Sequence, residues 1–83
     1  MLDQILRAKL DIEKIKEFPR YVLFNYKDRG ELINEMCAKE LRKDLNDLIR
    51  PRMLYGMKVI YDNSLFKKVR VLADSGLWVE EKI

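Results

Sequence analysis

Side chains that could carry acid–base or nucleophilic chemistry are scarce in this chain of 83 residues. There is no histidine, and the single cysteine, Cys37, lies in the middle of a predicted helix. Histidine is the usual proton carrier near neutral pH, so its absence excludes a Ser–His or Cys–His nucleophile. A reactive thiol also needs a nearby histidine or a helix N-terminus, and Cys37 has neither in the sequence. We therefore interpret Cys37 as a small core residue.

Carboxylates are the remaining candidates for chemistry. Asp62 and Asp74 are predicted to close opposite ends of a β-hairpin, too far apart to share a metal ion, and both are better explained as turn residues. The stretch Glu80-Glu81-Lys82 has the acid-x-Lys spacing of metal-dependent nucleases. Such a site needs a further aspartate on a neighbouring strand, and this stretch lies at the C-terminus, where a chain frays. We therefore expect no cofactor, no metal and no enzymatic activity.

The composition is that of a small folded domain. Hydrophobic residues make up 48% of the chain, and 17 basic residues outnumber 14 acidic ones, for a net charge of +3. The two signs alternate along the chain, whereas a dedicated nucleic-acid binder of this size concentrates its excess on one face. One cysteine cannot form an intramolecular disulfide, and no apolar run has the length of a signal peptide or a membrane span. We expect a single domain over residues 1–83 that is soluble and cytoplasmic.

Residues 2–17 are predicted to form an N-terminal helix with two apolar rows. The first row alternates spacings of four and three residues and consists of Met1, Ile5, Ala8, Ile12 and Ile15. The second row has i, i+4 spacing and consists of Leu2, Leu6 and Leu10. A helix in a two-layer domain normally has one apolar stripe, so two rows need two neighbours. Either both rows pack inside the domain, or the leucine row contacts another chain, which could be a second copy of this protein.

The body of the domain, residues 18–74, is predicted to run strand, helix, strand, strand. The continuous apolar run Tyr21–Phe24 indicates a strand that is covered on both faces and is therefore central in its sheet. Asp28 and Glu31 have the spacing of a capping box, which predicts a helix that begins there and ends before Pro51.

Two further strands are predicted at residues 53–61 and 67–73, paired as an antiparallel C-terminal hairpin. Gly56 interrupts the first and indicates a bulge or a close backbone approach. The second alternates apolar and basic residues, with Leu72 as the exception. Residues 75–83 form an apolar tail. The predicted fold class is thus α+β in the order α-β-α-β-β, with the helices on one face of a sheet of three to four strands.

This order of elements resembles a segment of the major capsid proteins of tailed phages. The first strand carries Pro19, Tyr21 and Val22; the second carries Leu54, Tyr55, Gly56, Met57, Val59 and Ile60; and the last carries Val69 and Val71. The match covers about two-thirds of the chain and lacks the long helix and extended loop that build a shell. The resemblance implies a small phage or prophage protein that reuses this piece, in the host cytoplasm, and it transfers no catalytic residue.

The apolar excess of the sequence favours a protein-binding function. More hydrophobic side chains are present than a core of this size hides, and tryptophan is enriched where partners bury their anchors. The predicted partner-binding residues are Leu2, Leu6, Leu10, Phe66 and Trp78. We predict a small phage-type accessory protein that docks onto a host or virion protein and modulates it.

The alternative is a nucleic-acid-binding protein that uses one face of the sheet. Cations and aromatic residues are interleaved near the predicted hairpin, a combination that binds single strands through phosphate contacts and base stacking. The residues of this alternative are Arg50, Arg52, Lys67, Lys68 and Arg70. A protein of this kind would lose affinity steeply as the salt concentration rises.

Overall fold

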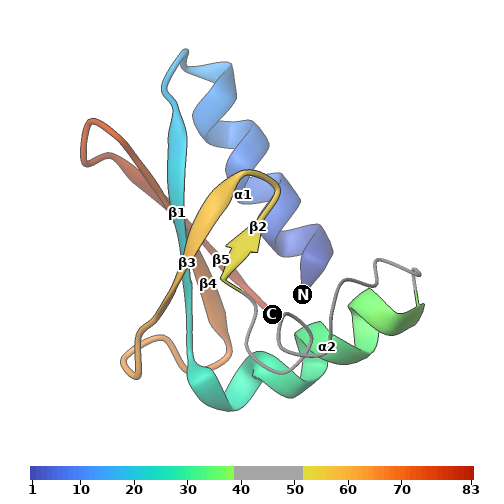
Figure 1. Ribbon diagram of the computed structural model, residues 1–83. Coiled ribbons are helices and arrows are strands. Elements are labelled where there is room, and N and C mark those ends of the chain that lie inside the picture. Colours follow the sequence, from blue (N-terminus) through green and yellow to red (C-terminus); the bar gives the residue numbers. More distant parts are fainter. Residues whose placement is uncertain (39–51) are drawn as a thin grey trace.

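The computed structural model describes residues 1–38 and 52–83. The elements follow in the order α1 (Leu2–Lys14), β1 (Pro19–Phe24), the short 3-10 helix η1 (Tyr26–Asp28), α2 (Arg29–Ala38), β2 (Met53–Leu54), β3 (Met57–Tyr61), β4 (Lys68–Ala73) and β5 (Trp78–Lys82). Figure 1 shows α1 lying along the sheet, with α2 near the end where α1 begins. The predicted α+β class is confirmed. The predicted helix beyond residue 38, Arg50 and the side chain of Cys37 lie outside what the structure describes.

β1 is the central strand of a mixed sheet, whose described strands follow the order β2-β3-β1-β4-β5. It pairs in parallel with β3 and antiparallel with β4. The central position predicted from the apolar run of β1 is therefore confirmed. The described sheet has five strands, more than the three to four expected. Residues 53–61 form two strands, β2 and β3, where one was predicted, and the C-terminal tail forms a further strand, β5.

The predicted pairing of residues 53–61 with 67–73 is wrong, because β1 lies between β3 and β4. Two other hairpins form instead, β2 with β3 and β4 with β5. Gly56 is not a bulge but the second residue of the β2–β3 turn, where Tyr55 has φ of 49° and Gly56 has φ of 80°. Two successive left-handed residues are typical of the tight turns that match strand twist. In the second hairpin, the apolar tail becomes the edge strand β5.

α1 packs on one face of the sheet through the first of its two predicted rows. Ile5, Ala8 and Ile12 are fully buried and share a core with the strand residues that point toward the helix. Leu2 of the second row is fully buried as well, which at this position agrees with the alternative in which that row packs inside the domain. It lies at the start of α1, where Glu35 of α2 accepts a hydrogen bond from its N–H at 3.2 Å.

Two buried polar side chains hold the crossover from β3 to β4 against the end of β1. Asn25 donates from Nδ2 to the carbonyl oxygen of Asn63 at 3.1 Å. The carboxylate of Asp28, which is 2% exposed, accepts a hydrogen bond from the N–H of Lys67 at 2.9 Å. The capping box predicted at Asp28 is therefore wrong. Its carboxylate bonds the crossover, while Asn25 caps η1 by accepting from the N–H of Lys27 at 2.8 Å.

Candidate functional site: the open face of the sheet

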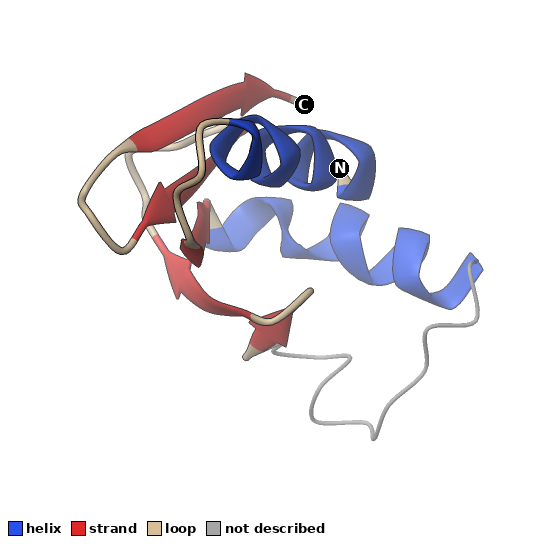
Figure 2. Ribbon diagram, turned by 90° about the horizontal axis from the view of Figure 1, so that it is seen from above, coloured by secondary structure: helices blue, strands red, loops and turns tan. Residues whose placement is uncertain are grey.

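The sheet has one covered face and one face that no described helix covers. Figure 2 shows both helices on the same side of the strands. On that side the strand residues are buried, whereas their alternate neighbours point away from the helices and are partly or largely exposed. We call the second side the open face. Its outward residues are Met53, Lys58, Ile60, Tyr21, Leu23, Lys68, Arg70, Leu72, Trp78, Glu80 and Lys82.

Strand register places the apolar members of the open face side by side. Ile60 pairs with Leu23, Tyr21 pairs with Leu72, and Leu72 pairs with Trp78. Since Tyr21 and Leu23 are two residues apart on β1, these five side chains form one continuous group across β3, β1, β4 and β5. Trp78 is 50% exposed and Ile60 is 36% exposed. We call this group the apolar patch.

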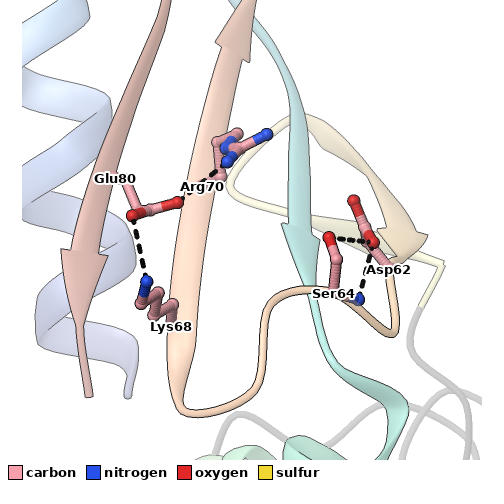
Figure 3. A network of polar contacts seen from close by, with 5 residues as sticks. All are labelled: Asp62, Ser64, Lys68, Arg70 and Glu80. Carbon is pink, nitrogen blue, oxygen red and sulfur yellow. Dashed lines mark hydrogen bonds and ion pairs between the residues drawn. The ribbon is translucent and has the colours of Figure 1, made fainter.

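A cluster of charged side chains borders the apolar patch on β4 and β5. Figure 3 shows Glu80 between two cations, with Arg70 Nη2 at 2.9 Å from Oε1 and Lys68 Nζ at 3.8 Å from Oε2. The guanidinium of Arg70 also lies over the indole ring of Trp78, 4.1 Å from its centroid. This cation–π contact and the hydrogen bond to Glu80 orient the Trp78 ring on the open face.

The open face is positively charged. Four of its side chains are cations, Lys58, Lys68, Arg70 and Lys82, and one is a carboxylate, Glu80, which leaves +3. On this face cations outnumber carboxylates four to one, although the two signs alternate along the sequence. Such a field attracts anionic partners and repels cationic ones.

A shallow hollow of about 300 Å³ lies at the β2–β3 end of the same face. It is lined by the apolar side chains of Tyr21 and Met53, by the cations Lys58 and Arg20, of which Arg20 is paired with Asp74 at 3.2 Å, and by Gly56. Its size and lining suit one apolar side chain of a partner next to a carboxylate.

The structure does not bring the predicted partner-binding residues into one surface. Leu6 is half-buried and Leu10 is 54% exposed, but both belong to α1, on the covered side of the sheet. Phe66 is 59% exposed in the crossover loop just before β4, whereas Trp78 pairs with Leu72 near the far end of that strand. Of this set, Trp78 alone lies on the open face.

The predicted nucleic-acid-binding residues are also divided among several places. Lys68 and Arg70 lie on the open face, where they share Glu80. Lys67 has a left-handed backbone and its Nζ lies 3.6 Å from Oδ1 of the buried Asp28, in the crossover. Arg52 is exposed just before β2, and Arg50 lies outside the described residues.

Residues that the sequence reasoning did not assign to a site make up most of the open face. Tyr21, Leu23, Lys58 and Ile60 carried no site prediction. Two features of the sequence nevertheless signal a second apolar face: the unbroken apolar run of β1, which predicts a strand covered on both faces, and Leu72, which breaks the alternation of β4. At the crossover, the hydroxyl and N–H of Ser64 both donate to Asp62, at 2.7 and 2.9 Å, and these bonds lower the pKa of that carboxyl (Figure 3).

Comparisons with known proteins found no relative. No protein-family model, curated protein or solved structure matches this chain. In the part of the chain that the structure describes, no helix has the length and apolar character to cross a membrane. Nor do the described residues contain three or more His, Cys, Asp or Glu side chains grouped as a metal site. The resemblance to a capsid segment stays a prediction.

Proposed function

We propose that this protein is a non-enzymatic protein-binding module that docks onto its partner through the open face of the sheet. The apolar patch carries this proposal, because a continuous group of outward apolar side chains on a folded domain marks an interaction surface. Trp, Tyr and Arg are the residues that dominate binding energy at protein interfaces, and Trp78, Tyr21 and Arg70 all lie on this face. Arg70 contacts the ring of Trp78, and Leu72 separates Trp78 from Tyr21.

The biological setting we propose is that of a small phage-type accessory protein that modulates a host or virion protein. Its support is the resemblance of the strand motifs alone. Association of two copies through α1 has less support, since Leu2 belongs to the core and Leu6 is half-buried.

A second candidate function is nucleic-acid binding, which the net charge of +3 on the open face favours. Tyr21 and Trp78 would then be stacking platforms, with Lys58, Lys68 and Lys82 near the phosphates.

The experiment that tests the first proposal compares two aromatic truncations of similar exposure. Trp78→Ser alters the open face, and Phe66→Ser alters the crossover loop outside the sheet. Wild-type protein and both variants are immobilised and exposed to nuclease-treated lysate of the organism that encodes the chain. We expect wild type and Phe66→Ser to retain one protein in stoichiometric amount, and Trp78→Ser to retain at least tenfold less.

The retained protein is then purified with wild type, and hydrogen exchange locates the contact. Protection of β1 and β4 amides without change in α1 supports the proposal. Retention by Trp78→Ser at the wild-type level contradicts it, as does retention that requires nuclease to be omitted, which favours the second candidate. Circular dichroism melting of each variant checks that the fold survives.

A further inference from the structure

We propose that the partner presents an acidic amphipathic helix to the open face. This inference rests on the proposed function and names the chemistry of the segment that the face binds.

The sheet geometry favours a helix as the occupant. A sheet with apolar side chains on both faces is normally covered by helices on both faces. α1 shows how the covered face is filled, with Ile5, Ala8 and Ile12 packed on the valines of β1 and β4. A helix is about 10 Å wide, which equals about two strand spacings, so one helix would cover β3, β1 and β4, where the centre of the apolar patch lies.

The charges around the apolar patch favour a negatively charged helix. Lys58 flanks the patch on β3, and Arg70 flanks it on β4, so cations lie on two sides of the apolar centre. A helix with a leucine-type stripe between glutamate or aspartate residues would place carboxylates near both. A second copy of this chain is a poor occupant, because two faces of +3 would repel each other.

The composition of the open face favours an acidic protein over a nucleic acid. Leu23, Ile60 and Leu72 offer aliphatic surface, which packs against apolar side chains but supplies no stacking plane for a base. One face of the Trp78 ring is already occupied by the Arg70 guanidinium at 4.1 Å. Phosphates laid along β4 and β5 would also approach the carboxylate of Glu80.

The hollow at the β2–β3 end provides a place for an anchor residue. Tyr21 and Met53, which line it, would receive one large apolar side chain of the helix, and Lys58, which also lines it, would pair with a carboxylate one turn away. Arg20 lines the hollow too, but it is already paired with Asp74 at 3.2 Å. This arrangement predicts that Lys58 contributes more to the preference for an acidic helix than cations outside the open face do.

The test uses four probes and the emission of Trp78, the single tryptophan of the chain. Three synthetic 18-residue helical peptides without tryptophan share one leucine stripe, and their flanking positions carry glutamate, glutamine or lysine. The fourth probe is a 15-nucleotide oligothymidylate. We expect saturable changes in Trp78 emission with the glutamate peptide, with a Kd at least tenfold lower than for the glutamine and lysine peptides.

A matched pair of charge reversals tests the role of the open face. Lys58→Glu alters the edge of the apolar patch, and Lys14→Glu makes the same change on α1, on the covered side. We expect Lys58→Glu to raise the Kd of the glutamate peptide at least fivefold and Lys14→Glu to leave it within twofold of wild type. Both positions are exposed, so melting temperatures should stay close to wild type.

Three other binding results would each refute a specific claim. Equal binding of the glutamine and glutamate peptides refutes the acidic partner and leaves protein docking on the open face in place. Binding of oligothymidylate without binding of any peptide refutes both this inference and the proposed function. Binding of no probe by a folded protein refutes the helix-binding face.

Discussion

Removing the carboxylate of Asp28 should release the crossover that separates β3 from β4. Asp28 is buried, accepts a hydrogen bond from the N–H of Lys67 at 2.9 Å, and has Lys67 Nζ at 3.6 Å. The two residues are 39 positions apart, so this contact fixes a long-range feature of the fold. Asp28→Ala removes both interactions, whereas Asp28→Asn keeps an oxygen acceptor and loses the charge.

The structure allows the two losses to be weighed separately. A hydrogen bond to a charged group contributes about 1.5–3 kcal/mol, and the N–H of Lys67, whose bond to Asp28 is part-buried, would lose this acceptor. The ion pair contributes less, about 0.2–1 kcal/mol, because the side chain of Lys67 is 56% exposed. We therefore expect Asp28→Ala to lower the free energy of unfolding by about 3 kcal/mol and Asp28→Asn by about 1 kcal/mol.

Urea denaturation followed by far-ultraviolet circular dichroism measures both changes. In a domain of this size, each kcal/mol corresponds to about 4–8 °C in Tm, so Asp28→Ala should melt roughly 12–24 °C below wild type. Asp74→Ala is the matched control, because Asp74 pairs with Arg20 at 3.2 Å but both side chains are more than 60% exposed. We expect the control to change stability by no more than about 1 kcal/mol. If Asp28→Ala were no more destabilising than Asp74→Ala, the proposed anchoring of the crossover would be refuted.

Three further predictions concern single contacts. Glu35→Ala should lower the free energy of unfolding by about 1 kcal/mol in urea melts, because Glu35 accepts from the N–H of Leu2 at the start of α1 and from the amino group of Met1; an unchanged midpoint would contradict this. Ser64→Ala should raise the pKa of Asp62 toward its ordinary value of 3.8 in an NMR titration, since one donor is lost. Because the folded pKa is lowered, the stabilisation from Asp62 is present above pH 3.8 and fades as the pH falls through the folded value, so wild type and Ser64→Ala should converge in stability in strong acid; a constant difference would contradict this. Gly30→Ala should stabilise by about 0.5–1 kcal/mol in thermal melts, as a helical position with free space, whereas Gly56→Ala should destabilise by about 1 kcal/mol because of its positive φ; the same sign for both would contradict the turn assignment.

The elements of this fold were largely predictable from the sequence, but their pairing was not. Hydrophobic periodicity and turn residues are local signals, and they placed α1, β1, β3 and β4 near their observed positions. Strand pairing depends on the order of the strands in the sheet, and that order is decided by contacts between residues that are far apart in the sequence. The bond from Asp28 to Lys67 is of that kind, since the spacing of Asp28 and Glu31 resembles a helix cap and gives no sign of the distant partner.

The candidate site was predictable only in part for a similar reason. Trp78, Lys68 and Arg70 were identified by residue type, and all three lie on the open face. Tyr21 and Lys58 became members of the same face only through the register of β1 and β3. For the leucine row of the N-terminal helix, helical spacing alone does not tell which residues meet the core, and the structure buries Leu2 but leaves Leu10 exposed.

Two irregularities in the sequence meet on the open face. A strand with one solvated face alternates, yet β1 carries apolar residues at both Tyr21 and Leu23 on its outward side, and β4 departs from its lysine–arginine alternation at Leu72. Register makes Tyr21 and Leu72 direct neighbours, with Leu23 beside Arg70 in the next row. Unrelated departures from polar–apolar alternation on separate strands would not be expected to lie side by side. Their coincidence favours the proposed docking role of this part of the face, in which a bound helix would complete the second layer that the apolar run of β1 predicts.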